Sequence, residues 1–118
     1  MLQLNHKKLD VWQLSIKFVS KIYKITSIYP KEELFSLTSQ TRRAATSIPA
    51  NIAEEASRKS LTERKRFFEI SRSSLVELDT HLEIANELDY LNKNILPELD
   101  KDLNELFAKL SNLIEKAR

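Results

Sequence analysis

The residue types that most often carry chemistry are sparse in this 118-residue sequence, which contains two histidines, no cysteines and no glycines. A di-iron centre in a helical bundle uses a Glu-x-x-His motif on two helices and two further glutamates. His81 has Glu77 four residues before it and Glu83 two residues after it, so no acidic residue lies at the required three-residue offset. His6 lies close to the N-terminus. We therefore interpret His81 as an ordinary histidine on a helix surface rather than a metal ligand.

The other common catalytic and cofactor-binding patterns are also missing. Ser-His-Asp catalysis lacks a nucleophile motif and a second histidine inside the fold. Nucleotide-binding loops need glycines, and thiolate metal sites and disulfides need cysteines. Trp12 is interpreted as a core or interface residue rather than part of a cofactor site. We expect no enzyme activity, no cofactor and no small-molecule substrate, with a metal-dependent enzyme as the weakest alternative.

Basic residues carry the one chemistry that the composition supports, which is contact with phosphate groups. The formal net charge is only +2, yet residues 1–72 carry 14 Lys+Arg against 7 Asp+Glu, whereas residues 73–118 carry 5 against 10. Lysine and arginine bind nucleic-acid backbones by displacing condensed counterions. The candidate nucleic-acid-binding residues are Lys7, Lys8, Arg58, Lys59, Arg64, Lys65 and Arg66. The alternative is that they only solubilise helix ends, because no aromatic residues are interleaved for base stacking.

Four amphipathic helices must position these residues. Apolar residues at steps of three and four predict helices over about residues 9–28, 32–58, 61–88 and 95–117. Pro30 ends the first helix, and Ser60-Leu61-Thr62-Glu63 is a capping box at the start of the third. The fourth has an a/d seam of leucines that Phe107 and Ile114 widen and Ala117 continues. The predicted fold is all-α: a single up-down-up-down antiparallel four-helix bundle over residues 1–118.

The first two predicted helices have unusual faces. The first carries two adjacent apolar stripes, wider than a monomeric surface helix needs, which favours self-association. The stripes are Leu9, Trp12, Ile16, Val19 and Tyr23, and Val11, Phe18, Ile22, Ile25 and Tyr29. The second has an inner face of Leu34, Leu37, Thr41, Ala44, Ile48 and Ile52. Because this pattern continues in phase past Pro49, we predict a kinked helix, with Thr46, Ser47 or Asn51 bonding to freed carbonyls.

A polar stripe runs beside that inner face. Its residues are Gln40, Arg43, Ser47, Asn51 and Glu54, and they form either a solvated face or a polar network between helices or subunits. In the predicted topology the candidate binding residues, Lys116 and Arg118 share one end of the bundle, and most carboxylates lie at the other. Arg64→Glu with Arg66→Glu is expected to abolish nucleic-acid binding while leaving the bundle folded.

Several motifs resemble the four-helix bundle protein family, also called the 23S rRNA intervening sequence proteins. They are Leu9-Asp10-Val11-Trp12, Tyr29-Pro30-x-x-Glu33, Arg43-Ala44-Ala45, Ser47-Ile48-Pro49-Ala50-Asn51-Ile52-Ala53-Glu54 and Ser74-Leu75-x-Glu77-Leu78. Within them we assign Trp12, Arg43, Ala44, Ser47, Pro49, Asn51 and Glu54 as signature and helix-packing residues. Two departures are Glu55 and Ser73, which stand where the family usually has glycine. The first suggests that the second helix continues further or ends without a glycine cap.

The resemblance implies a ring-like homopentamer with no established catalytic residues, so no active site is transferred. Some members are encoded inside insertions in bacterial 23S rRNA genes, and related accessory proteins of diversity-generating retroelements form basic pentameric barrels that bind nucleic acid. We expect RNA or DNA binding through a basic ring; the alternative is a protein–protein adaptor or scaffold with no nucleic-acid role. Residues 1–8 lack the order of a signal peptide, and no apolar run approaches the roughly 20 residues of a membrane span. We therefore expect a soluble, cytoplasmic protein.

Overall fold

Four long helices make up the fold in the computed structural model, which describes residues 1–116. They are α1 (Asp10–Thr26), α2 (Leu37–Ala56), α3 (Leu61–Glu87) and α4 (Leu96–Lys116). Short 3-10 turns lie at η1 (Asn5–Lys8), η2 (Lys31–Glu33) and η3 (Lys93–Ile95). The described residues form no strand, so the all-α prediction is confirmed.

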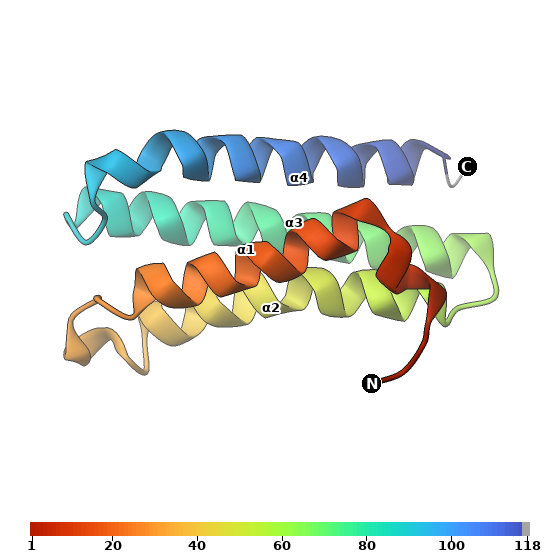
Figure 1. The fold of residues 1–118 in the computed structure, drawn as a ribbon, viewed down its shortest axis with the longest axis horizontal. Coiled ribbons are helices and arrows are strands. Elements are labelled where there is room, and N and C mark those ends of the chain that lie inside the picture. Colours follow the sequence, from red (N-terminus) through yellow and green to blue (C-terminus); the bar gives the residue numbers. More distant parts are fainter. Residues whose placement is uncertain (117–118) are drawn as a thin grey trace.

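The helices lie along one long axis of a molecule that measures 43 × 26 × 21 Å (Figure 1). In that view α3 and α4 lie above α1 and α2. The turns that follow α1 and α3 are at the left end, and the turn between α2 and α3 is at the right end. The start of α1 and the end of α4 also lie toward the right, so the two ends of the molecule carry different turns.

The core consists of apolar side chains that all four helices contribute. Ile22, Ile48, Ile52, Leu78, Leu106 and Leu110 are its largest fully buried apolar side chains. Burying each aliphatic side chain of this size contributes about 1.5–3 kcal/mol. The two stripes predicted for the first helix are buried to different extents. Val11, Phe18 and Ile22 are buried, whereas Ile16 and Tyr23 are exposed; Leu9, Trp12 and Val19 are partly buried against the core. The wide apolar face of α1 is therefore only partly covered within a single chain.

The second helix begins at Leu37, and the predicted start near residue 32 was wrong. Ser36, the residue before it, has a non-helical backbone (φ −130°, ψ −108°), and the preceding segment forms η2 instead. Leu34, predicted to face inward, is exposed in this turn. The turn has its own anchor, because the Tyr90 hydroxyl donates a 2.9 Å hydrogen bond to the Glu33 carboxylate. Hence the two turns at this end of the bundle are tied together.

Pro49 lies inside α2, and the helix continues through it to Ala56. Asn51 Nδ2 donates to the Ser47 carbonyl at 2.8 Å and Thr46 Oγ1 to the Arg43 carbonyl at 3.1 Å, so neither bonds to the Ala45 carbonyl that lacks its amide donor at Pro49. A donor that the sequence did not indicate is the buried Ser71 of α3, whose hydroxyl donates to the Ile48 carbonyl at 2.9 Å. The small serine therefore holds α3 against α2 beside the proline.

Leu88 is exposed because it follows the last residue of α3, where the chain turns through a positive φ of 62° at Asp89. One inward prediction on α4 was wrong. Phe107 is exposed too, although Ile114 is buried as predicted. The predictions for Ala117 and Arg118 fall outside the described residues.

Candidate nucleic-acid interface

The candidate basic residues come from three neighbouring segments at the right end of the bundle in Figure 1. Lys7 and Lys8 belong to η1, which packs against α1 and α2. The other five lie in the turn after α2 and the first two turns of α3. That turn has a defined geometry, because the Ser60 hydroxyl accepts a 3.1 Å hydrogen bond from the Glu63 amide and so caps α3 as predicted. The segment Arg58–Arg66 is thus held on an ordered helix start.

Arg64 is not available to a ligand in the way the sequence suggests. Its Nε lies 2.6 Å from Glu55 Oε1, and the Glu55 side chain is only 4% exposed, whereas that of Arg64 is 45% exposed. Glu55 lies three residues after the buried Ile52, on the same face of α2. A carboxylate in such a position needs a cationic partner, because an uncompensated buried charge is strongly destabilising. Arg64 therefore neutralises Glu55 and joins the end of α2 to the start of α3.

The remaining cations differ in how firmly they are held. Arg58 Nη2 pairs with Glu54 Oε2 at 2.9 Å, and its guanidinium lies 4.8 Å from the centre of the Phe67 ring. Both members of that ion pair are exposed, so the contact contributes little. Lys7 Nζ donates to the Leu2 carbonyl. Lys8, Lys59, Lys65 and Arg66 make no ion pair or side-chain hydrogen bond among residues 1–116.

Some signature residues pack inside the bundle, and others are exposed to solvent. Ala44 and Pro49 are buried, and Trp12 meets the edge of His6 with 5.3 Å between ring centres. Ser47 Oγ lies 2.8 Å from Ser74 Oγ of α3, which gives the polar stripe one contact between helices. Gln40, Arg43 and Glu54 are exposed, so the stripe is a helix–helix network in its middle and a solvated face elsewhere.

A comparison with protein families identifies a match over most of the chain. The family described as 23S rRNA-intervening sequence protein matches residues 7–112. The chain belongs to this family. The 23S rRNA-intervening sequence proteins are not a known enzyme family. No curated protein matches the chain.

Arg42 is a further structural residue of this intervening sequence protein that sequence reasoning missed. Its Nε donates to Thr26 Oγ1 at 2.8 Å and its Nη2 donates to the Tyr23 carbonyl at 3.3 Å. The guanidinium also lies 4.5 Å from the centre of the Tyr23 ring. A cation at the C-terminal end of a helix satisfies free carbonyls and opposes the helix dipole. Arg42 thus caps α1.

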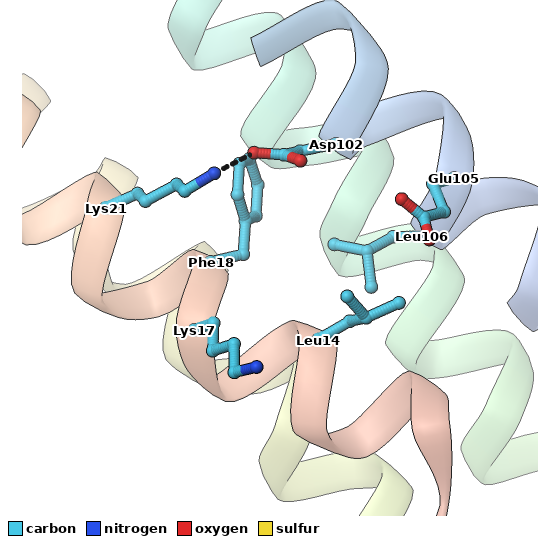
Figure 2. Close-up of a pocket in the computed structure, with 7 residues that line it drawn as sticks. All are labelled: Leu14, Lys17, Phe18, Lys21, Asp102, Glu105 and Leu106. Carbon is cyan, nitrogen blue, oxygen red and sulfur yellow. Dashed lines mark hydrogen bonds and ion pairs between the residues drawn. The ribbon is translucent and has the colours of Figure 1, made fainter. Parts of the chain in front are cut away.

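Figure 2 shows a small hollow between α1 and α4, lined by Leu14 and Phe18 on one side and Leu106 on the other. Lys21 closes it with ion pairs to Asp102 at 2.7 Å and to Glu98 at 2.6 Å. The hydrogen bond to Asp102, followed by that to Glu98, raises the pKa of Lys21. The hollow has a volume of about 100 Å³, below the roughly 300–1,000 Å³ of typical ligand pockets.

Two further properties bear on the chemistry of the chain. Within residues 1–116 no group of three His, Cys, Asp or Glu side chains is arranged to hold a metal ion. None of the helices in that range has both the length and the apolar content that crossing a bilayer requires. The chemistry that the surface offers is therefore charge on exposed lysines and arginines and apolar contact on exposed helix faces.

Proposed function

We propose that this intervening sequence protein is a non-enzymatic bundle of the bacterial cytoplasm that assembles into a homopentamer and binds RNA or DNA. The observation that supports binding is the set of exposed or half-exposed cations without partners at one end, Lys59, Lys65 and Arg66. Their ammonium and guanidinium groups are not neutralised by carboxylates of residues 1–116, so they are available to displace counterions from phosphates.

The architecture we propose is the up-down-up-down antiparallel bundle with α2 bent at Pro49. Short turns between long helices support this arrangement, and the missing amide of Pro49 supports the bend. In this arrangement every chain of a ring presents its basic segment, Arg58–Arg66, on the same side. Five weak sites joined in one assembly bind far more tightly than one site alone.

Charge reversal at the unpaired cations tests the proposal. The variant Lys59→Glu/Lys65→Glu/Arg66→Glu is expected to raise the Kd for a labelled RNA at least about tenfold, since each phosphate contact contributes a salt-dependent term. Fluorescence anisotropy at low salt, repeated at rising salt, measures both the Kd and the salt dependence.

The matched control changes the same amount of charge elsewhere. The control alters three exposed lysines outside the Arg58–Arg66 segment, in the variant Lys24→Glu/Lys31→Glu/Lys101→Glu. It is expected to change the Kd less than about threefold. Equal losses in the two triple variants would mean that only net charge matters. No binding by the unaltered protein at low salt would refute the nucleic-acid role.

A second candidate function is a protein–protein adaptor, and the left end of the bundle in Figure 1 supports it. Ile28 and Phe35 are exposed there, Phe35 with 92% of its surface. Exposed aromatic side chains are frequent anchors of protein interfaces. An adaptor predicts a stoichiometric protein that co-purifies with the chain in the absence of nucleic acid and is lost in Phe35→Ser. Retention of that protein by Phe35→Ser would argue against this end as the contact.

A further inference from the structure

The left end of the bundle in Figure 1 carries an excess of negative charge. We call it the acidic end and define it as residues 27–36 and 87–95, which include the two turns at that end. It contains four carboxylates and two lysines. The side chains of Glu32, Glu87 and Asp89 are exposed and make no ion pair among residues 1–116. These three carboxylates are therefore available to a positively charged partner.

Apolar side chains project from the same end. Phe35 and Ile28 are 92% and 71% exposed. The backbone that carries them is tied to the second turn, because the Tyr90 hydroxyl bonds to the Glu33 carboxylate at 2.9 Å and the rings of Tyr29 and Tyr90 lie 5.5 Å apart. The acidic end thus presents apolar surface and unpaired carboxylates together, on turns that other contacts hold in place.

The other end of the bundle has the complementary chemistry. Residues 7–8 and 54–66 hold seven lysines and arginines against three carboxylates. Among these cations Leu61, the first residue of α3, is 61% exposed. The two ends are separated along the 43 Å axis of the molecule, so they cannot meet within one chain (Figure 1). Their opposite charges can be paired only between copies.

We propose that the acidic end of one copy binds the Arg58–Arg66 segment of another copy, and that this end-to-end contact competes with nucleic acid for the same cations. This inference rests on the proposed function and adds a means of regulating its binding site. Carboxylates of the acidic end take the place of phosphates as partners of the unpaired cations, and Phe35 and Leu61 bring apolar surface together. Two acidic ends, or two basic ends, would place like charges against each other, so only unlike ends associate.

The size of the ends limits the strength of one contact. The bundle has a cross-section of 26 × 21 Å, which encloses less than the roughly 800 Å² that each partner contributes to a standard stable interface. Two single chains are therefore expected to associate weakly. In the proposed homopentamer all acidic ends lie on one side and all Arg58–Arg66 segments on the other, so two assemblies meet through several pairs of ends at once. The contact is expected between assemblies at low salt, where exposed charges are least screened.

Sedimentation velocity over a salt series tests this contact. The unaltered protein is expected to form species larger than one assembly at low salt, and single assemblies at about 1 M salt, where the Debye length is roughly 3 Å. Glu32→Lys/Glu87→Lys is expected to raise the protein concentration needed for the larger species at least about tenfold, because like charges then meet. Its Kd for a labelled RNA should stay within about threefold of the unaltered value. The matched control, Glu69→Lys/Asp79→Lys, makes the same charge change at exposed positions along α3 and is expected to form the larger species.

Two mixtures examine the pairing of the ends directly. Lys59→Glu/Lys65→Glu/Arg66→Glu is also expected to remain a single assembly at low salt. Assemblies of this variant mixed with assemblies of Glu32→Lys/Glu87→Lys are expected to form larger species, because each end then meets an end of opposite charge. A short RNA in excess is expected to convert the larger species of the unaltered protein into single assemblies, because its phosphates occupy the cations.

The outcomes separate this inference from the proposed function. A single assembly that binds RNA at low salt and forms nothing larger would overturn the end-to-end contact alone; the same size is expected if the acidic end binds only a foreign protein. Larger species that Glu32→Lys/Glu87→Lys leaves intact, that the control removes equally, or that excess RNA does not change would also overturn it. A chain that stays a 13.8 kDa monomer would refute the self-association on which the contact depends. If circular dichroism shows that the lysine variant is unfolded, Glu32→Gln/Glu87→Gln tests the same charges.

Discussion

Replacing Arg64 with alanine is expected to destabilise the bundle more than its exposed position suggests. The change leaves the Glu55 carboxylate buried, with 4% of its side chain exposed and no guanidinium at 2.6 Å. Removing one partner from a fully buried ion pair costs about 3–5 kcal/mol. An exposed pair contributes only about 0–1 kcal/mol. Because the Arg64 side chain is 45% exposed, solvent screens part of the interaction. We therefore expect the free energy of unfolding to fall by about 2 kcal/mol.

Thermal unfolding followed by circular dichroism measures this loss at a fixed protein concentration. For a chain of 118 residues a loss of that size lowers the Tm by about 6–10 °C. Arg66→Ala is the matched control: Arg66 is exposed and has no partner among residues 1–116, so its removal is expected to change stability by less than about 0.5 kcal/mol.

A second substitution identifies the cause of the loss. Adding Glu55→Gln to Arg64→Ala is expected to restore most of the stability, because a neutral amide is far less costly to bury than a carboxylate. If Arg64→Ala and Arg66→Ala lower the Tm equally, the Glu55–Arg64 pair is no more than a surface contact and the reasoning fails. The same argument shows why Arg64→Glu is a poor test of nucleic-acid binding: it places a second carboxylate against Glu55.

Three further predictions concern stability. Tyr29→Phe is expected to leave the Tm unchanged or to raise it, because the Tyr29 hydroxyl is buried without a hydrogen-bond partner among residues 1–116. Burial raises the pKa of Tyr29 to about 12, so the unfolded chain loses this proton first and stability should fall between pH 10 and pH 12, less steeply in Tyr29→Phe. The hydrogen bond from Lys21 lowers the pKa of Glu98, so this pair stabilises the fold at pH values above the ordinary carboxylate pKa. The stabilisation is lost as the pH falls and Glu98 is protonated. Glu98→Gln should therefore weaken the dependence of the Tm on pH in the acidic range. Ser71→Ala is expected to cost about 1 kcal/mol in urea unfolding, because the Ile48 carbonyl loses a buried donor.

Much of the fold was predictable because helix periodicity is strong in the second half of the chain. The capping box located the first residue of α3, and the leucine seam located α4. The start of α2 was not predictable in the same way, because Leu34 lies in phase with the inner face of the helix. Only the backbone of Ser36 and the bond between Tyr90 and Glu33 show that the segment before Leu37 forms a separate turn.

The sequence showed which residues of the candidate interface are charged, but not which of them are free of ion pairs. The segment Arg58–Arg66 is basic in sequence, yet its pairing depends on which carboxylates fold against it. Glu55 was recognised only as a departure from a glycine position, although its place on the buried face of α2 was the available signal. Arg42 shows the same limit, because its role depends on the end of α1 lying beside it. Partners that are distant in sequence decide which arginines stabilise the fold.

Side chains of the signature segment of α2 lie on three different surfaces of the helix. Ile48 and Ile52 face the core, while Ser47 bonds to α3 through Ser74. Pro49 and Ala50 line a hollow between α1 and α2 on the outside of the bundle. At the end of the segment Glu54 forms an ion pair with Arg58, one of the candidate nucleic-acid-binding residues. Its side chains therefore serve helix packing, whereas the proposed contact with phosphates depends on the Arg58–Arg66 segment that follows it.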